Sequence, residues 1–355
     1  MKRLSVILIC LLIFAALASC GYEQLPESDD VAPIETQKEP EKSIEEQGPL
    51  LSAEFDTNTL KTSAVDFRGI TFSLADGKLD VSGYVSDETQ KYIMVNLNMS
   101  EEAKIYAPVI DGKFHIVTDI LPLADEMPVD IYAGKEEFGM YRSVILDFVR
   151  IINDGGVWRI KESPVYKQNI ELFCREKDME ESLLATDWIQ SDDSRIAELS
   201  DSITAGCRTD YDKAKAVHDW LAENIYYDFD ALAAGRYDES DALSVLENKR
   251  GVCEGFANLG AALLRHQGIP CVVQGGYALG ISTDRVWNEA NVNTTESNHA
   301  WNEVYVDGRW ILMDATWDTD NEYRNGAYEQ GEFIGDTYFD TDHAFFALSH
   351  KAMDN

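Results

Sequence analysis

The chain has 355 residues, and its 64 acidic and 30 basic residues give it a net charge of −34. Hydrophobic residues make up 45% of the sequence, so it is expected to fold into globular domains, and it is long enough for two. The negative charge argues against nucleic acid as a partner, because phosphate binding requires a basic surface. We interpret the excess acid as a solvated surface that keeps the protein soluble.

The first nineteen residues form a segment of their own. Lys2 and Arg3 precede the apolar run LSVILICLLIFAALAS, which is too short for a stable membrane span. The run ends in LASC, and small residues before Cys20 resemble the lipobox of bacterial lipoproteins. That resemblance implies that residues 1–19 are a lipoprotein signal peptide and that lipidated Cys20 anchors the protein on the extracytoplasmic face of the cell membrane. The alternative is an ordinary secretory signal with an incidental cysteine, and the mature chain is exported in either case.

Residues 20–54 are rich in acidic residues and proline and contain few large apolar side chains. Such a segment buries too little surface to offset the entropy lost on ordering. We therefore predict that it is a disordered acidic tether between the membrane and the globular part of the chain.

From residue 55 to 162 the apolar residues alternate with polar ones. The stretches KLDVSGYV, YIMVNLNM, KFHIVTDI and PVDIYAG show this period of two, and Met99 continues the alternation of YIMVNLNM. Asp111-Gly112 and the sequence DGG at 154–156 are typical of turns between antiparallel strands. This pattern predicts an antiparallel β-sandwich that is immunoglobulin-like, and its role is that of a spacer or a substrate-binding module.

Residues 163–355 begin with helical periodicity and end in strands, which predicts an α+β domain. The first amphipathic helix is DYDKAKAVHDWLAENIYYD, with Asp210 as its expected N-cap. The second is SDALSVLENKRG, which we expect to begin with Ser240 as cap and to end at Gly251. The third follows in KRGVCEGFANLGAALLRHQGIPC, where Gly268 and Pro270 stop the helix.

Cys253 lies in the first turn of the third helix. The free N–H groups and the dipole of a helix N-terminus stabilise a thiolate, and the same N–H groups can hold an oxyanion. Taken alone, however, a cysteine at this position is more often a small core residue.

The hairpin NHAWNEVYVDGRWILMDATW supplies the partners that a nucleophilic cysteine requires. Asp307-Gly308 is a two-residue turn signal, so we expect Val306 to pair with Arg309. That register places His299 and Asp314 as diagonal neighbours on one face, within reach of one hydrogen bond. An acid at this position would fix the orientation of the imidazole and stabilise its charged form. Each residue also has a plainer interpretation, as a core histidine and as an acid that caps a turn.

The cysteine block GVCEGFANLGAALLRHQGIPCVVQGGY and the block NHAWNEVYVDGRWILMDATWD resemble the core of the transglutaminase-like superfamily, over roughly residues 205–320. The resemblance implies a papain-like arrangement in which Cys253 is the nucleophile, His299 the base and acid, and Asp314 the orienting acid. It also implies acyl transfer through a thioester on protein or peptide amides, as peptidase, deamidase or transglutaminase.

Several alternatives and secondary sites stay open at this point. A non-catalytic adhesin or scaffold could use the same fold as a binding module. No cofactor is expected, and a metal site built on Cys253 and His299 lacks companion ligands. Cys174 and Cys207 could form a disulfide or remain free. Tyr226 and Tyr227 are candidate side-chain donors to an oxyanion.

Overall fold

The computed structural model describes residues 61–62, 64–67, 69–85, 87–139, 141, 143–236, 239–280, 285–331 and 334–354. The predicted signal peptide, the lipidation residue Cys20 and the predicted tether over 20–54 lie outside the described residues. Within the described residues, no helix has both the length and the apolar character needed to cross a membrane.

The elements of the sandwich region come first in the chain. Its strands are β1 Lys61–Thr62, β2 Ala64–Phe67, β3 Ile70–Ala75, β4 Lys78–Tyr84, β5 Tyr92–Leu97, β6 Lys104–Pro108, β7 Lys113–Asp119, β8 Glu126–Gly134, β9 Ser143–Asp154 and β10 Val157–Lys161, with the 3-10 helix η2 Glu101–Ala103.

Helices and short strands alternate after β10. The helices are α1 Tyr166–Phe173, η3 Glu181–Leu183, α2 Ser194–Thr204, α3 Asp210–Asn224, α4 Phe229–Ala234, α5 Ala242–Asn248, α6 Cys253–His266, α7 Glu289–Asn293, α8 Ala315–Asp318 and α9 His343–Phe346. The strands are β11 Tyr226–Asp228, β12 Arg250–Gly251, β13 Cys271–Ala278, β14 His299–Val306, β15 Arg309–Met313, β16 Glu322–Arg324, β17 Ala327–Glu329 and β18 His350–Ala352.

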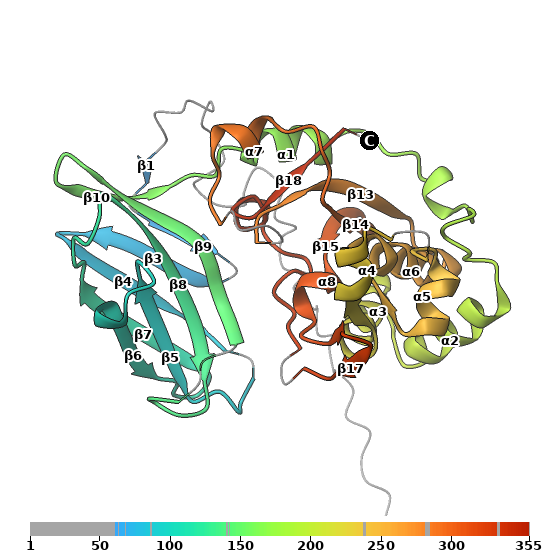
Figure 1. Ribbon diagram of the computed structural model, residues 1–355, viewed down its shortest axis with the longest axis horizontal. Helices are drawn as coiled ribbons and strands as arrows, with labels where there is room; N and C mark the ends of the chain where they lie inside the picture. The colour runs from blue at the N-terminus through green and yellow to red at the C-terminus, as the bar shows by residue number, and fades with distance from the viewer. Residues whose placement is uncertain are drawn as a thin grey trace, which may run out of the picture. The chain divides into compact units, whose positions relative to one another are not determined.

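The first ten strands form two antiparallel sheets, with strand orders β1-β10-β9-β8-β5-β6 and β2-β3-β4-β7 (Figure 1, blue to green). The predicted period of two is confirmed, because Leu79, Val81, Ile93 and Val95 are fully buried between the sheets. Met99 departs from the prediction: it is 64% exposed, because β5 ends two residues earlier and the chain turns there with positive φ. The predicted boundary at residue 162 directly follows the end of β10, and the domain division itself stays a prediction.

The predicted turn residues of the sandwich adopt the expected conformation. Asp111 and Gly112 have φ of 51° and 74°, as a two-residue turn between antiparallel strands requires. Gly155 and Gly156, between β9 and β10, also have positive φ. Together with the helical second half of the chain, these sheets confirm the predicted α+β class.

The second half of the chain is built around the antiparallel sheet β15-β14-β13-β18. Asp307 and Gly308 form the predicted turn, with φ of 49° and 89°. The predicted register also holds: Val306 pairs with Arg309, and the ladder continues to the pair of Asn302 with Met313. A second sheet, β12-β11-β16-β17, contains parallel pairs on both sides of β11.

Helix α6 packs against β14 through small residues and a buried amide. The Asn302 side chain donates a hydrogen bond of 2.9 Å to the carbonyl oxygen of Ala257. A Cβ atom at Gly260 would lie 3.0 Å from Asn302 Oδ1, so the helix and strand approach more closely than a larger residue would permit. The predicted apolar stripe Val252, Phe256, Leu259 and Leu263 is buried. These contacts fix the axis of the helix that begins at Cys253.

The predicted helix boundaries need correction at two N-caps and one end. The cap of α3 is Thr209, which forms a capping box with Asp212, and Asp210 is the first helical residue. The cap of α5 is Asp241, not Ser240, because its carboxylate accepts a hydrogen bond from the backbone of Ser244. Helix α5 also ends earlier than expected, since Lys249 adopts a left-handed conformation before Gly251.

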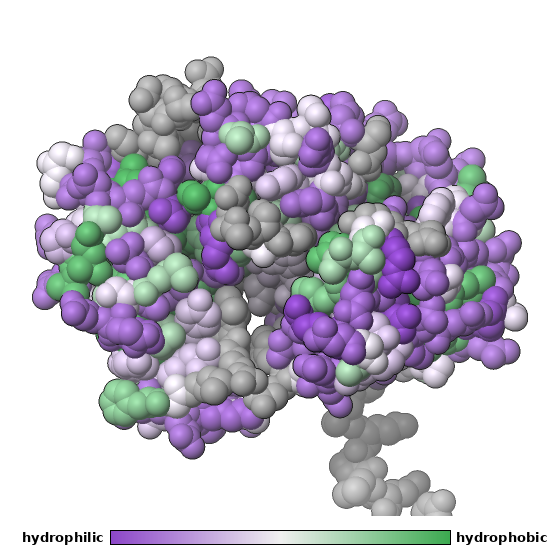
Figure 2. All heavy atoms as spheres, viewed as in Figure 1, coloured by the Kyte–Doolittle hydropathy of each residue, from purple (hydrophilic) through white to green (hydrophobic). Residues whose placement is uncertain are grey.

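The face of the molecule in Figure 2 is mostly hydrophilic, with scattered apolar residues. This surface agrees with the excess of 64 acidic over 30 basic residues. It supports the interpretation of the net charge as a solvated surface.

Candidate active site

Cys253 is the first residue of α6, as the sequence predicts. Its N-cap, Val252, has no side chain that can accept a hydrogen bond, so no capping side chain occupies the N–H groups of the first turn. The sulfur is therefore placed at the positive end of a 14-residue helix. Cys253 is 9% exposed, which leaves the residue at the edge of the core and not deep within it.

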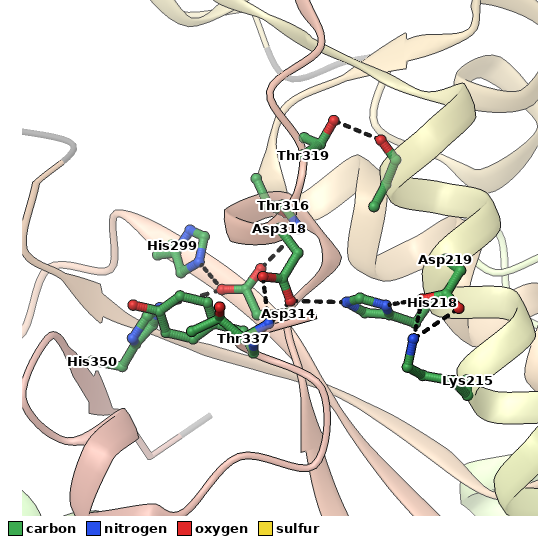
Figure 3. A network of polar contacts seen from close by, with 12 residues as sticks. Lys215, His218, Asp219, His299, Asp314, Thr316, Asp318, Thr319, Thr337 and His350 are labelled. Carbon is green, nitrogen blue, oxygen red and sulfur yellow. Dashed lines mark hydrogen bonds and ion pairs between the residues drawn. The ribbon is translucent and has the colours of Figure 1, made fainter. Parts of the chain in front are cut away.

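His299 and Asp314 form a buried hydrogen-bonded pair (Figure 3). His299 is the first residue of β14, and its Nε2 lies 2.6 Å from Asp314 Oδ2. The two side chains are 0% and 1% exposed. The predicted contact between these residues is therefore present in the structure.

The contact is made somewhat differently from the predicted cross-strand arrangement. The ladder stops at the pair of Asn302 with Met313, and β15 ends there. Asp314 instead caps the short helix α8, where its Oδ1 accepts a 3.0 Å hydrogen bond from the backbone N–H of Thr316. The cap fixes one carboxylate oxygen and leaves Oδ2 to face His299.

The electrostatics of the pair favour a charged imidazole beside a carboxylate. Burial disfavours the charged form of His299, but the charge of Asp314 and then that of Cys253 outweigh it and raise the pKa of His299 to about 10. Burial likewise opposes ionisation of Asp314, yet His299 and His350 hold the pKa of its carboxyl well below its usual range. Asp314 is thus an anion and His299 a cation at neutral pH.

The second ring nitrogen of His299 is the one left for Cys253. Nε2 is occupied by Asp314, while the buried Nδ1 forms no hydrogen bond with acceptable geometry to any described residue. Cys253 nevertheless lies close enough to raise the pKa of His299. Catalytic hydrogen bonds are often loose before substrate binds, so this arrangement is compatible with a thiol–imidazole pair.

His350 is a site residue that the sequence-based prediction missed. It is the first residue of β18, and its Nε2 lies 3.2 Å from the same oxygen, Asp314 Oδ2, that His299 contacts (Figure 3). The sequence offers little to find it, because β18 has three residues and lies 36 positions after Asp314. Only the pairing of β18 with β13 brings it to the site.

Trp317 lies against both site histidines. Its ring centroid is 6.0 Å from that of His299 and 4.3 Å from that of His350. Trp317 also lines a cavity of about 340 Å³ that includes His299, together with Thr316, Tyr227 and Phe229. A substrate at His299 would therefore contact aromatic side chains.

The two tyrosines proposed as oxyanion donors differ in position. Tyr227 lines the cavity beside His299. Tyr226 packs edge-on against Tyr328, with ring centroids 5.0 Å apart. Successive residues of a strand point to opposite faces, so of the two only Tyr227 is placed to meet a substrate in this cavity.

A second buried network braces the segment that follows Asp314 (Figure 3). His218 on α3 contacts Asp318 through Nε2 and Asp219 through Nδ1, each at 3.0 Å. Asp318 also accepts hydrogen bonds from the backbone of Thr337 and Tyr338. The carbonyl oxygen of Tyr338 in turn accepts a hydrogen bond from the backbone N–H of Asp314. Helix α3 is thereby connected to the backbone of Asp314.

The remaining predicted sites concern cysteines and metals. Cys174 and Cys207 are free, so the disulfide alternative is not realised. Within the described part of the chain, His299, Asp314 and His350 are a group whose possible ligand atoms all lie within 4.8 Å of one another. Cys253 does not belong to that group, so the alternative of a metal on Cys253 and His299 gains no support.

Residues 197–315 match the family model described as the Transglutaminase-like superfamily. This segment is transglutaminase-like. It contains Cys253, His299 and Asp314, whereas His350 lies beyond its end.

Curated relatives are similar over the same region. Over 160 residues the chain is 28% identical to Kyphoscoliosis peptidase of Mus musculus. This match covers 44% of this chain and 23% of the mouse protein. Over 175 residues it is 29% identical to the uncharacterized protein YebA of Bacillus subtilis (strain 168). This match covers 47% of this chain and 24% of YebA. The transglutaminase-like match thus spans about a quarter of each relative's length.

Among solved structures, the periplasmic domain of TgpA from Pseudomonas aeruginosa is similar to this chain, with 14% identity and a TM-score of 0.29. The match covers 69% of this chain and 72% of the TgpA chain. The red sea bream transglutaminase is also similar, with 11% identity and a TM-score of 0.27. The match covers 76% of this chain and 53% of the transglutaminase chain.

Proposed function

We propose that this protein is a thiol enzyme that acts on protein or peptide amides, with Cys253 as nucleophile, His299 as proton carrier and Asp314 as the acid that orients His299. The observation that carries the proposal is the fully buried His299–Asp314 pair, whose 2.6 Å hydrogen bond occupies Nε2 and leaves Nδ1 for the thiol. The uncapped N-terminus of α6 supports it, because free backbone N–H groups stabilise both a thiolate and an oxyanion.

The reaction follows from these positions. In the ion pair, His299 Nδ1 holds the proton that Cys253 has given up, and the thiolate sulfur attacks the carbonyl carbon to form a C–S bond. Backbone N–H groups at the start of α6 stabilise the oxyanion. The C–N bond breaks as His299 returns the proton to the leaving amine, and a thioester remains on Cys253. Water or a second amine then attacks the thioester and releases the thiol.

Hydrolysis is favoured over transamidation as the second step. Water requires no dedicated site, whereas transamidation requires a channel that favours amines over water. The two outcomes are separated by incubating the protein and an amide substrate with a fluorescent primary amine. Incorporation of the amine indicates transamidation, and release of free acid alone indicates hydrolysis.

Iodoacetamide labelling, followed by peptide mass spectrometry, tests the site itself. Cys253 should react rapidly below about pH 6, where an ordinary cysteine with a pKa near 8.5 is protonated. The His299→Ala variant should lose this acidic reactivity. Cys174 and Cys207 are free in the same sample and serve as internal controls. Slow labelling of Cys253 that follows an ordinary titration and is unchanged by the variant contradicts the proposal.

We further propose that the protein is exported and held at the extracytoplasmic face of the membrane by a lipid on Cys20. The LASC sequence and the charged, then apolar, first nineteen residues support this localisation. In the native host, Cys20→Ser should move the protein from the membrane fraction to the soluble exported fraction. An unchanged membrane fraction contradicts lipid attachment at Cys20.

A further inference from the structure

We propose that His350 is a positioning residue of the active site: as a neutral imidazole it donates a hydrogen bond to Asp314 Oδ2 and holds this carboxylate in the orientation that His299 requires. The inference rests on the proposed function, because it assigns His350 a role within that catalytic group. It extends the site to a residue beyond the segment that matches the transglutaminase-like family.

The first support is the hydrogen-bond geometry of the carboxylate. Oδ2 of Asp314 lies 2.6 Å from His299 Nε2 and 3.2 Å from His350 Nε2, while Oδ1 lies 3.0 Å from the backbone N of Thr316. All three side chains of this group are 0% or 1% exposed, so water does not replace a missing partner. Removal of His350 would leave Asp314 Oδ2 with a single donor.

The protonation state of His350 follows from its two side-chain partners. An ionised carboxylate only accepts hydrogen bonds, so Nε2 of His350 must carry a proton. Nδ1 lies 2.8 Å from the hydroxyl oxygen of Ser349, which donates to it when the ring is neutral. Burial lowers the pKa of His350 to about 4, which keeps the ring neutral at physiological pH. Ser349 and Asp314 together select the Nε2–H tautomer.

Aromatic neighbours hold the ring of His350 in place. Phe346 stacks on it with centroids 4.0 Å apart and an angle of 15° between the planes. Trp317 lies at 4.3 Å on another side, and Trp301 meets it edge-on at 5.7 Å. A donor held this rigidly fixes the carboxylate, which in turn fixes His299.

The sheet places the two histidines on the same face. His299 on β14 pairs with Gly276 of the central strand β13, and His350 on β18 pairs with Ala278 of that strand. Gly276 and Ala278 are two residues apart on β13. Their partners, His299 and His350, therefore direct their side chains to the same face of the sheet. At Gly276 a Cβ atom would lie 2.3 Å from the Trp301 ring, so glycine is required for the aromatic cluster to form.

A metal site is the competing explanation for the same three residues. Zinc would require bonds of about 2.0–2.2 Å from each ligand. The 2.6 Å separation of His299 Nε2 and Asp314 Oδ2 is a hydrogen-bond length and leaves no room for an ion between the two atoms. The geometry therefore favours hydrogen bonding, and the experiment below includes zinc as an outcome.

The test measures the rate of Cys253 alkylation by iodoacetamide between about pH 4 and about pH 9, a range that ends just above the pKa of about 8.5 of an ordinary thiol. It compares the parent with His350→Ala, His350→Gln, Ser349→Ala and Phe346→Leu. Without the donor, Asp314 protonates at a higher pH. His350→Ala should therefore raise the acidic limit of reactivity, which is the pH below which Cys253 no longer reacts with iodoacetamide. The alkylation rate of Cys253 below about pH 6 should fall by about tenfold or more, which is the typical effect of removing a hydrogen-bond partner that orients an active-site residue.

Three variants separate positioning from structure. His350→Gln retains an N–H donor and should recover part of the acidic reactivity, while Ser349→Ala should shift the limit in the same direction as His350→Ala, but less. Phe346→Leu removes the stacked ring and keeps the hydrogen bonds, so it should lower the melting temperature and move the limit by less than His350→Ala does. Parent-like reactivity in His350→Ala, or an equal shift in Phe346→Leu, overturns the inference.

Nitrogen NMR of ¹⁵N-histidine-labelled parent protein provides a test that requires no folded variant of His350. The expected signal is a neutral Nε2–H imidazole at neutral pH, assigned by its displacement in the spectrum of Ser349→Ala, which removes the partner of Nδ1. An Nδ1–H tautomer, an imidazolium, or stoichiometric zinc binding by protein dialysed against EDTA overturns the inference. If Cys253 of the parent reacts as an ordinary thiol, the proposed function fails, while the tautomer measurement still decides the role of His350.

Discussion

Asp314 depends entirely on protein donors for its charge. The residue is 1% exposed, so burial alone would favour the protonated acid. Contacts from His299, His350 and the backbone of Thr316 reverse this preference and keep the pKa of the carboxyl low. A buried acid that stays ionised is able to stabilise an imidazolium through many turnovers.

Asp314→Asn tests this role at the residue scale. The amide keeps nearly the same shape but loses the charge that raises the pKa of His299. We expect kcat on any amide substrate to fall by roughly 10²–10⁴ with a smaller change in KM, by analogy with orienting acids elsewhere. Steady-state kinetics of the variant measure this, and a change in KM with an unchanged kcat contradicts it.

In the proposed mechanism, the alkaline limit of activity follows from His299. Its pKa is raised to about 10, so His299 holds the proton needed by the leaving amine up to that pH and loses it above. Amide cleavage should therefore decline above about pH 10, whereas Cys253 alkylation, which needs no proton donor, should not. Parallel pH profiles of the two reactions show the difference, and a shared decline with intact folding contradicts the assignment.

At the scale of elements, His218 connects α3 to the segment that follows β15. Burial opposes its charge, but hydrogen bonds to Asp219 and Asp318 outweigh it, and the pKa of His218 is raised. A raised folded-state pKa gives stability that is complete below the unfolded pKa of about 6.5 and is lost as pH rises through the folded value. The ion pairs therefore stabilise this junction most at mildly acidic pH.

His218→Ala should lower the free energy of unfolding by about 3 kcal/mol at pH 6, since it breaks a buried ion pair. The difference from the parent should shrink at alkaline pH, where His218 loses its proton. Urea unfolding at several pH values measures it. His115→Ala is the matched control, because its pair with Asp80 is largely exposed, and it should change stability by less than about 0.5 kcal/mol. A pH-independent loss in His218→Ala contradicts the charged role.

Gly276→Ala tests the packing of strand β13 within the sheet that carries the site. Alanine there would place Cβ 2.3 Å from the Trp301 ring and 2.4 Å from the carbonyl oxygen of Lys351. We expect a loss of about 1–3 kcal/mol in stability, together with reduced Cys253 alkylation, because the strand that carries His350 is displaced. Gly206→Ala is the control, since a Cβ there has no neighbour within 4 Å. Equal melting temperatures of the two variants contradict this packing argument.

At the scale of the whole molecule, the net charge of −34 has a measurable consequence. Like charges distributed over a surface repel one another and destabilise the compact state, and salt screens that repulsion. The melting temperature should therefore rise between about 10 mM and about 150 mM sodium chloride, as the screening length falls from about 30 to 8 Å. Differential scanning calorimetry tests this, and a falling melting temperature indicates that attractive ion pairs dominate instead.

Local sequence signals predicted elements in both halves of the chain well. The alternation around Leu79 and the turn at Asp307-Gly308 both rest on neighbours within a few residues, and the structure confirms both. Cap residues were less predictable: Thr209 and Asp210, like Ser240 and Asp241, are adjacent residues that can each act as a cap. Which one does so depends on where the helix axis is fixed by packing, and that is not a local property.

The sequence by itself determined the α+β class, the start of α6 at Cys253 and the contact of His299 with Asp314, because each depends on local periodicity or on a single tight turn. Only the tertiary structure decided the place of His350, which the pairing of β18 with β13 brings to Asp314. It also decided the brace from His218 to Asp318, whose residues are 100 positions apart. Contacts at such separations depend on how whole elements pack, and no spacing in the chain encodes them.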